Sequence, residues 1–163
     1  MKVGAVVAGG CACVLRPGEK TALKGLEFAE WLEEVGLPPC AVNIVNGFGE
    51  TCGATLVAHP GVDKIAFNGS AAVGKLIVKS AADTLTRVTL ELGGKSPNIF
   101  FDGAVWEAAV DGALFGVFIT QGEVCSSGSH ILAEKKLYST FVEARPAKSE
   151  TRTLGAPSGP ATY

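Results

Sequence analysis

Apolar and polar residues follow a helical period between residues 21 and 35. The apolar side chains recur every three or four positions there, and the charged ones fall off that face, which is the pattern of an amphipathic helix. The apolar positions are Leu23, Leu26, Phe28, Trp31, Leu32 and Val35. Gly36 and the prolines at 38 and 39 end the pattern, so we expect a helix over residues 21–35.

Elsewhere, short apolar runs alternate with further helical patterns. The runs at 11–16, 42–45 and 64–67 are short and mainly apolar, as is typical of strands buried on both faces of a parallel sheet. The other expected strands are residues 87–92, 98–101 and 131–133, and the other expected helices are residues 49–59, 70–82, 105–119 and 138–144. This order predicts an α/β fold, a parallel sheet with crossover helices, whose ligands bind at the carboxyl ends of the strands. From residue 146 onward the chain is polar and rich in Pro, Gly, Ser and Thr, and we expect no helix or strand there.

The charge balance and the apolar content of the chain argue against a nucleic-acid-binding protein and a disordered one. The chain has 16 acidic and 14 basic residues and a formal net charge of −2, without the basic excess of nucleic-acid-binding proteins, so we expect no nucleic-acid partner. The 47% apolar content excludes a disordered chain. The apolar stretch at 112–120 is far shorter than the roughly 18 residues of a membrane span, and we expect no membrane association.

The five cysteines bear on the compartment. Their number is odd, and Cys11 and Cys13 are too close to pair comfortably, which favours a reducing cytoplasm over a disulfide-bonded scaffold. An alternative is an exported lipoprotein, because the segment from Lys2 to Cys11 faintly resembles a signal peptide, although its apolar core is short and interrupted by glycine. No CxxC or HxxxH spacing occurs, so we expect no metal site.

Four of the five cysteines and both histidines are interpreted as residues that support the fold and take no part in catalysis. Cys11, Cys13, Cys40 and Cys52 are interpreted as small apolar residues that fill a strand, a turn and a helix. His59 precedes Pro60-Gly61 at a helix end and is expected to cap carbonyls there, and His130 is interpreted as structural.

A first candidate site is the segment Phe67-Asn-Gly-Ser-Ala-Ala-Val-Gly74, where an expected strand leads into an expected helix. The free amides and positive dipole end of a helix N-terminus favour a phosphate, and the Ser70 hydroxyl could reach a phosphate oxygen. Gly69 and Gly74 permit close approach of the backbone. The alternative is an ordinary helix capped by Ser70, which has no ligand.

Two side chains are candidates for catalysis. Cys125 follows a long apolar helix and precedes small residues that leave room for a substrate, and its thiolate could attack a carbonyl carbon. The alternative is an inert buried cysteine.

Glu91 lies among apolar strand residues and two glycines, where burial would suit a carboxylate to act as a general base. Alternatively, Glu91 points to water at a strand end or pairs with Lys95.

Five segments together resemble the aldehyde dehydrogenase superfamily. Leu90-Glu-Leu-Gly-Gly-Lys-Ser-Pro-Asn98 is similar to the glutamate signature of that family, and Gln121-Gly-Glu-Val-Cys-Ser-Ser-Gly-Ser129 is similar to its cysteine signature. The other three segments are Phe67-Asn-Gly-Ser70, Val14-Leu-Arg-Pro-Gly-Glu19 and Val42-Asn-Ile-Val-Asn-Gly-Phe-Gly49. Because the five occur in the family's order, the resemblance extends over nearly the whole chain.

The resemblance implies an NAD(P)-dependent oxidation of a small-molecule aldehyde to a carboxylic acid in a Rossmann-like fold. Cys125 would attack the aldehyde to give a thiohemiacetal, which becomes a thioester after hydride transfer. Glu91 would activate the water that hydrolyses this thioester, and the amide of Cys125 would form part of an oxyanion hole. The implied assembly is a homo-oligomer.

The same resemblance assigns cofactor contacts. Arg16 and Glu19 would hold the adenosine ribose, Gly69 and Ser70 would hold the pyrophosphate, and Leu92 would be a further cofactor contact. A carboxylate at the position of Glu19 repels a 2′-phosphate, so NAD is favoured over NADP.

The chain also departs from the family. Family members are considerably longer, and we interpret residues 1–92 as most of the NAD-binding domain and residues 93–163 as the start of the catalytic domain, so that the fold is incomplete. The family's oxyanion-hole asparagine and nicotinamide-ribose glutamate are absent. Thr120 stands where an Asn is expected, His130 where an Arg is expected, and Asn68 where a Thr is expected. The alternative function is therefore a catalytically inactive dinucleotide-binding fragment or remnant of the family.

Overall fold

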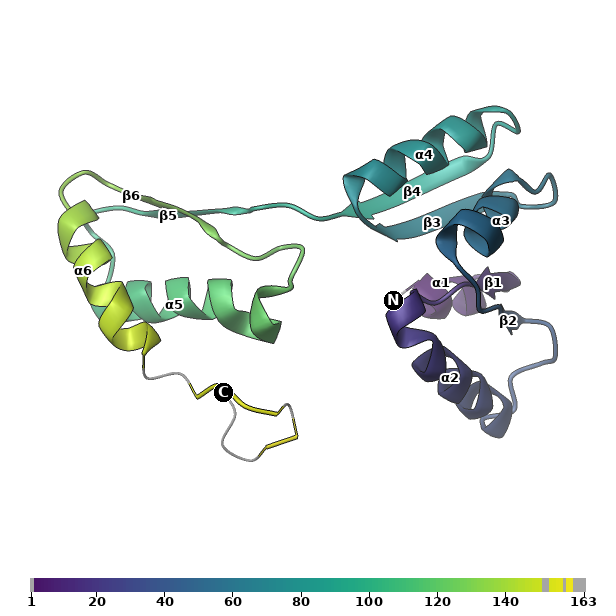
Figure 1. Cartoon of the computed structure of the whole chain (residues 1–163), viewed down its shortest axis with the longest axis horizontal. Helices are drawn as coiled ribbons and strands as arrows, with labels where there is room; N and C mark the ends of the chain where they lie inside the picture. Colours follow the sequence, from purple (N-terminus) through teal and green to yellow (C-terminus); the bar gives the residue numbers. More distant parts are fainter. Residues whose placement is uncertain (1, 151–152, 157, 160–163) are drawn as a thin grey trace. The chain divides into compact units, whose positions relative to one another are not determined.

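The computed structural model describes residues 2–150, 153–156 and 158–159. The chain divides into two compact units, Met1–Leu92 and Gly93–Tyr163. Helices and strands alternate in both units, as the colours of Figure 1 show along the sequence. The expected α/β class is confirmed, whereas the assignment of the units as NAD-binding and catalytic domains stays a prediction.

The first unit contains four helices and four strands. In chain order they are α1 (Lys2–Ala8), β1 (Cys13–Leu15), α2 (Ala22–Glu34), β2 (Val42–Ile44), α3 (Ala54–Ala58), β3 (Lys64–Gly69), α4 (Ala71–Ala82) and β4 (Arg87–Leu92). A 3₁₀ turn at Glu19–Thr21 precedes α2, and a π-helical turn at Gly49–Gly53 precedes α3. The expected helices over 21–35 and 70–82 are confirmed, and the expected helix over 49–59 is divided between the π turn and α3.

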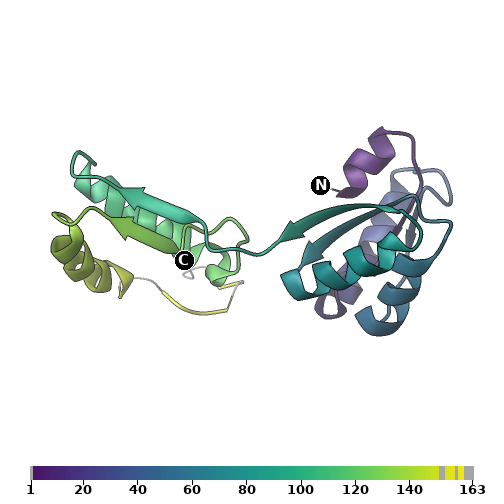
Figure 2. The ribbon, with the colours of Figure 1, turned by 90° about the horizontal axis from the view of Figure 1, so that it is seen from above.

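The strands form parallel pairs of sequence neighbours. In the described residues β1 pairs with β2, β3 with β4, and β5 (Pro97–Phe100) with β6 (His130–Ala133). The registers place Cys13 opposite Val42, Lys64 opposite Arg87, and Pro97 opposite His130. A helix follows the first strand of each pair, so each pair is a crossover unit (Figures 1 and 2).

The expectation that the strands at 11–16, 42–45 and 64–67 are buried on both faces is wrong, because exposed and half-buried residues alternate along them. Along β3 and β4, half-buried residues such as Ile65 and Val88 alternate with exposed ones such as Ala66 and Thr89. The helix α4 packs against these strands and buries Ile77 and Ala81. Because a helix covers one face only, every second strand residue stays exposed.

The second unit has a compact apolar centre. Its helices are α5 (Trp106–Phe118) and α6 (Tyr138–Ser149), which contribute Val110, Ala113, Leu114 and Phe141 to the centre. The Phe141 ring lies 5.0 Å from that of Phe100 on β5 and 6.0 Å, edge-on, from that of Trp106. These contacts join both helices to the strands.

The helix α6 extends beyond the expected end at residue 144. The polar composition from residue 146 predicted no helix, yet α6 runs to Ser149. Lys148 forms ion pairs of 3.0 Å with both Glu107 and Asp111 of α5. The last turn of α6 is thus held by side chains that lie far away in the sequence, which local composition does not reveal.

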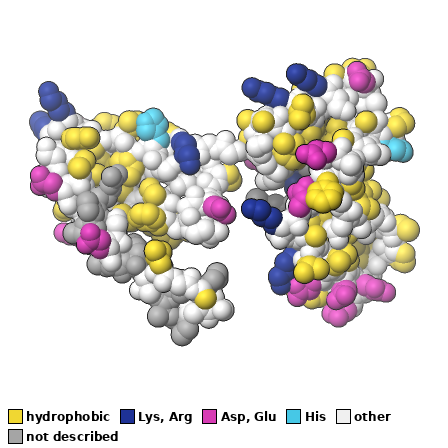
Figure 3. All heavy atoms as spheres, in the orientation of Figure 1, with side chains coloured by type: hydrophobic (Ala, Val, Ile, Leu, Met, Phe, Trp, Pro, Cys, Tyr) yellow, Lys and Arg dark blue, Asp and Glu magenta, His cyan; other side chains and the backbone are white. Residues whose placement is uncertain are grey.

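Both units also expose apolar side chains, as the space-filling view in Figure 3 shows. Among them are Ile99 and Leu132, which are cross-strand partners on β5 and β6. In the described part of the chain, no helix is long and apolar enough to cross a membrane.

Candidate functional site

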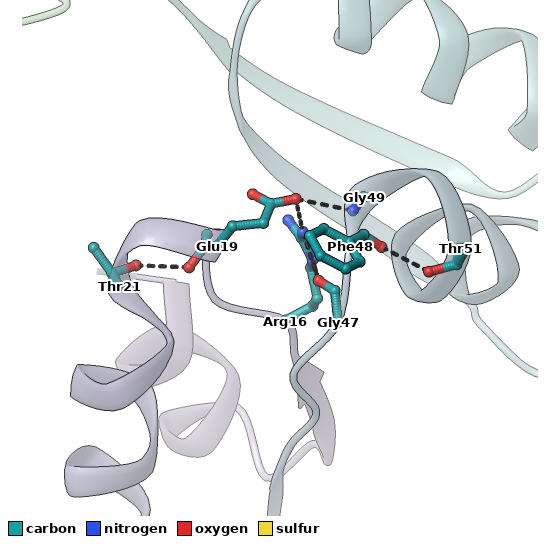
Figure 4. A network of polar contacts seen from close by, with 8 residues as sticks. Arg16, Glu19, Thr21, Gly47, Phe48, Gly49 and Thr51 are labelled. Carbon is teal, nitrogen blue, oxygen red and sulfur yellow. Dashed lines mark hydrogen bonds and ion pairs between the residues drawn. The ribbon is translucent and has the colours of Figure 1, made fainter.

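Arg16 and Glu19 lie together at the carboxyl ends of β1 and β2 (Figure 4). The guanidinium of Arg16 forms an ion pair with the carboxylate of Glu19. Arg16 also donates from Nε and Nη2 to the carbonyl oxygen of Gly47, over 3.0 and 2.7 Å. The amide of Gly49 donates to Glu19 Oε1 over 2.9 Å. These four residues, Arg16, Glu19, Gly47 and Gly49, are called the β1–β2 loop network below.

The β1–β2 loop network keeps the Glu19 carboxylate charged. Hydrogen bonds from its own backbone amide and from the amide of Gly49, together with that from Arg16, hold the pKa of Glu19 below its usual range. The Arg16 side chain is mostly covered, at 18% exposure, whereas that of Glu19 is 50% exposed. An anionic acceptor is therefore fixed where it remains open to a ligand.

Close packing of α2 positions the loop that carries these residues. Gly25 of α2 is buried, and a Cβ atom added there would lie 2.4 Å from Cγ of Pro17. Because Pro17 directly follows Arg16, the absence of a side chain at Gly25 lets the loop lie against the helix. Sequence reasoning gave Gly25 no role.

Gly69 and Ser70 connect β3 to α4 as the sequence predicts. The Ser70 hydroxyl caps α4 by accepting a hydrogen bond of 3.3 Å from the Val73 amide. A Cβ atom at Gly69 would lie 2.4 Å from the Phe67 ring, so this glycine also makes room for that ring. The expected cap and the close approach at Gly69 both occur, and phosphate binding at the start of α4 stays a prediction.

Of the two interpretations of Glu91, burial is wrong, and the alternative in which the side chain points to water near the strand end is confirmed. Its side chain belongs to the exposed face of β4, opposite Asn68 of β3, because alternation along the strand turns it away from the face that α4 covers. Lys2 of α1 lies near this face, since its ammonium donates to the carbonyl of Ala66 over 3.3 Å. Partial desolvation lowers the pKa of Lys2, and the Glu91 carboxylate opposes that shift. Glu91 therefore acts on Lys2 through its charge, and the ion pairs of the described residues include neither a Lys2–Glu91 pair nor the suggested pairing with Lys95.

Leu92 ends β4 and is half-buried under α4. A Cβ atom at Gly74 would lie 3.1 Å from Cδ2 of Leu92, so the strand and the helix are in close contact at this point. The six predicted site residues of the first unit therefore lie near the carboxyl ends of strands β1, β3 and β4, which is where parallel strands bind ligands.

Cys125 lies in the second unit on an exposed turn between α5 and β6. The amide of Ser127 donates to the carbonyl of Val124 over 3.0 Å and closes the turn around the cysteine. The Ser127 hydroxyl donates to the carbonyl of Gly116 on α5 over 2.6 Å, while its carbonyl accepts from the amide of Ser96 over 3.1 Å. The turn is therefore anchored on two sides, and the expected alternative of a buried cysteine is wrong.

The backbone before Cys125 is unusual. Thr120 and Gln121 have φ angles of 52° and 47°, in the left-handed region that favours glycine, and Gly122 follows at 81°. For a β-branched residue such as Thr120 this conformation carries steric strain.

The remaining cysteines and histidines differ partly from expectation. Cys11 and Cys40 are exposed, so their interpretation as apolar filling is wrong, because β1 begins only at Cys13 and Cys40 lies in the turn before β2. Cys13 and Cys52 are half-buried. His59 was expected to cap carbonyl groups at the helix end. Instead its Nδ1 accepts a hydrogen bond of 3.0 Å from the amide of Gly61. In the described residues no three His, Cys, Asp or Glu side chains gather to hold a metal ion.

Comparison with known proteins decides the family. The model of the aldehyde dehydrogenase family matches residues 1–163. The chain belongs to the aldehyde dehydrogenase family. Retinal dehydrogenase 2 of Homo sapiens is 44% identical over 162 residues, which are 99% of this chain and 31% of that protein. Chloroplastic betaine aldehyde dehydrogenase of Atriplex hortensis is 47% identical over 142 residues, which are 87% of this chain and 28% of that protein.

Solved aldehyde dehydrogenase structures have the same fold. The NAD⁺ complex of an aldehyde dehydrogenase from Bacillus cereus superposes with a TM-score of 0.95 at 43% identity, over 99% of this chain and 33% of that one. The chain thus spans about a third of the length of the aldehyde dehydrogenases that it matches. The family resemblance inferred from the five sequence segments is confirmed.

Three residues that interact with the predicted site residues were not identified from the sequence. Gly47 and Gly49 complete the β1–β2 loop network through backbone atoms. A glycine pair directly after an apolar strand is a signal that could have identified them. The charge of Glu91 acts on Lys2, which lies 89 positions earlier in the sequence, and no local pattern indicates that interaction.

Proposed function

We propose that a protein carrying this sequence oxidises small aldehydes to carboxylic acids with NAD. The observation that carries the proposal is the family match over residues 1–163. In this proposal residues 1–92 hold NAD and residues 93–163 supply the reactive thiol. Assembly as a homo-oligomer stays a prediction from the family.

The chain's residues fit NAD in charge and position. The exposed carboxylate of Glu19 can accept hydrogen bonds from ribose hydroxyls, because the β1–β2 loop network holds it in place and keeps it ionised. The Ser70 hydroxyl accepts a bond from Val73 and still has its own proton to donate to a phosphate oxygen at the start of α4. Leu92 is a further cofactor contact. When bound, NAD supplies the hydride acceptor.

The proposed chemistry of the chain's own residues has two stages. The Cys125 thiolate attacks the aldehyde carbonyl and forms a thiohemiacetal, which becomes a thioester on oxidation. Glu91 then takes a proton from the water that attacks the thioester, which releases the acid and regenerates the thiol. The exposed position of Cys125 supports the first stage, because the thiol is open to a substrate.

The choice of NAD over NADP follows from Glu19. A fixed carboxylate at the ribose 2′-hydroxyl repels a 2′-phosphate, so Glu19→Gln is expected to raise the affinity for NADP relative to NAD. Calorimetric titration of both nucleotides measures that ratio. A ratio that is unchanged in Glu19→Gln would contradict the ribose assignment.

The decisive experiment for the proposed function is Cys125→Ser in the intact protein. NADH production with several aldehydes should be lost, while NAD affinity should stay close to the wild-type value, because an alkoxide forms far less readily than a thiolate near neutral pH. Cys11→Ser, which also replaces an exposed cysteine, is the matched control and should keep full turnover. Turnover retained in Cys125→Ser would reject the proposed nucleophile.

A further inference from the structure

Two asparagines of the chain are directly followed by glycine, in the pairs Asn46-Gly47 and Asn68-Gly69. The proposed aldehyde oxidation gives neither asparagine side chain a role. Asparagine is a chemically labile residue, because the next backbone nitrogen can attack its side-chain amide carbon. Glycine shields that nitrogen least, since it has no Cβ atom. The two pairs lie in different backbone settings, and this difference separates their reactivity.

The first pair lies in the loop that follows β2, where both Asn46 and Gly47 are exposed. The bonds between β1 and β2 end just before it, because the Val45 amide still donates to the carbonyl of Leu15 over 3.0 Å. Among the hydrogen bonds of the described residues, none involves the amide of Gly47 or the side chain of Asn46. The attacking nitrogen and the carbon that it attacks are therefore accessible, and no hydrogen bond occupies either group.

The second pair belongs to a strand. Asn68 and Gly69 are the last residues of β3, and they pair with Glu91 and Leu92 of β4. In a parallel strand ψ is about +115°, which directs the next backbone nitrogen away from the side chain of the preceding residue. The pairing with β4 resists the rotation that would bring the two groups together. This pair therefore serves as an internal reference for the first one.

We propose that Asn46 is a site of self-modification, which becomes aspartate or isoaspartate through a cyclic imide formed with Gly47. The Gly47 nitrogen attacks Cγ of Asn46, the bond from Cγ to the side-chain nitrogen breaks, and ammonia leaves with the proton of the Gly47 amide. Water then opens the imide. Cleavage of its bond to Cγ gives aspartate, and cleavage of its bond to the main-chain carbon gives isoaspartate. Water is the only co-reactant, and no atom changes its oxidation state.

The modification would alter the β1–β2 loop network. The carbonyl of Gly47 accepts from Nε and Nη2 of Arg16 over 3.0 and 2.7 Å (Figure 4). Isoaspartate places an extra methylene group in the main chain directly before Gly47, which displaces that carbonyl from Arg16. Both products also add a negative charge next to Gly47, in a network where the lowered pKa of Glu19 already keeps one carboxylate ionised. The two loops should consequently be joined less firmly in the modified protein.

Incubation of the unsubstituted protein in water enriched in oxygen-18 tests the assignment. Peptide mapping should find the label at residue 46, and the same peptide should accept methyl groups from S-adenosylmethionine in the presence of an isoaspartyl methyltransferase. The peptide that contains Asn68 should stay unlabelled. In denaturant the strand pairing is lost, and Asn68 should then react at a rate comparable with that of Asn46. The proposal fails if Asn46 stays unlabelled in the folded protein, if Asn68 reacts there as fast, or if the difference persists in denaturant.

Two variants separate the modification from other effects of ageing. Asn46→Gln keeps a side-chain amide but requires a larger ring, so it should acquire no label at this position and should keep its stability during the same incubation. The wild-type protein should lose stability in denaturant unfolding as isoaspartate accumulates. Asn46→Asp carries the charge without the longer backbone, and it should be less affected than the isoaspartate form. An equal loss of stability in Asn46→Gln would show that the change does not arise at Asn46.

Discussion

The amide of Gly49 donates a hydrogen bond of 2.9 Å to the carboxylate of Glu19, which lies 30 positions earlier in the chain. This bond joins the loop after β1 to the loop after β2, and Arg16 strengthens the junction from the other side through Gly47. A single carboxylate thus holds together two loops at the proposed ribose site. Its charge should therefore affect stability as well as binding.

Glu19→Gln should lower the stability of the protein at neutral pH and have little effect in acid. The folded-state pKa of Glu19 is below its usual value, so its stabilising contribution is complete above the usual value, about 4.3, and is lost as the pH falls through the lower folded-state pKa. Denaturant unfolding at several pH values measures the difference. Glu30→Gln, an exposed change on α2, is the control, and a pH-independent difference would contradict the role of the charge.

Two glycine substitutions in helices should act in opposite directions. Gly25→Ala should destabilise by about 1–3 kcal/mol, because the new Cβ atom would overlap Pro17. Gly112→Ala in α5 should stabilise by about 0.5–1 kcal/mol, since no neighbouring atom lies within 4 Å and alanine favours the helix. Chemical unfolding of both variants tests the pair. Stabilisation by Gly25→Ala would show that α2 is not held against the Arg16 loop.

Glu91→Gln should slow the proposed thioester hydrolysis by roughly 10²–10⁴-fold, because the glutamine cannot take a proton from water. The acyl-enzyme should then accumulate after one round of hydride transfer, which stopped-flow absorbance of NADH and intact mass both detect. Glu33→Gln on α2 is the matched control. Normal steady-state turnover in Glu91→Gln would count against this role.

The same substitution should change the protonation of Lys2. The Glu91 carboxylate raises the Lys2 pKa against the effect of desolvation, so its removal should lower that pKa further. The pH dependence of Lys2 acylation, followed by peptide mass spectrometry, measures the shift without any enzyme assay. An unchanged profile would mean that Lys2 and Glu91 do not interact.

Thr120→Asn should stabilise the second unit by about 1 kcal/mol, because asparagine tolerates the left-handed backbone better than a β-branched residue does. Thr89→Asn, at an exposed position of strand β4, is the control and should not stabilise. Thermal unfolding of both variants decides the question. Destabilisation by Thr120→Asn would indicate that the threonine side chain makes a compensating contact.

The sequence predicted well those features that depend on neighbouring residues. The helix cap at Ser70 follows from a small polar residue directly before an apolar helical pattern, and the structure has that bond to Val73. The limits of β4 were likewise predicted at Arg87–Leu92. Local periodicity and capping chemistry are sufficient for such elements.

Features that depend on distant residues were not predictable. The last turn of α6 depends on Lys148 reaching two carboxylates of α5. The exposure of Glu91 depends on which face of β4 the helix α4 covers, because apolar neighbours in the sequence do not determine the direction of a strand residue. For the candidate site, the family resemblance pointed to Arg16 and Glu19, while their backbone partners appeared only in three dimensions.

In the described chain the six strands form three pairs, and the two strands of each pair are joined by a connection that contains a helix. Every sheet contact is therefore made between segments close together in the chain, so the entropy lost in closing each loop is small. Contacts of low sequence separation favour fast folding. The three strand pairs can accordingly form one after another as the chain leaves the ribosome, each without waiting for residues that have yet to be synthesised.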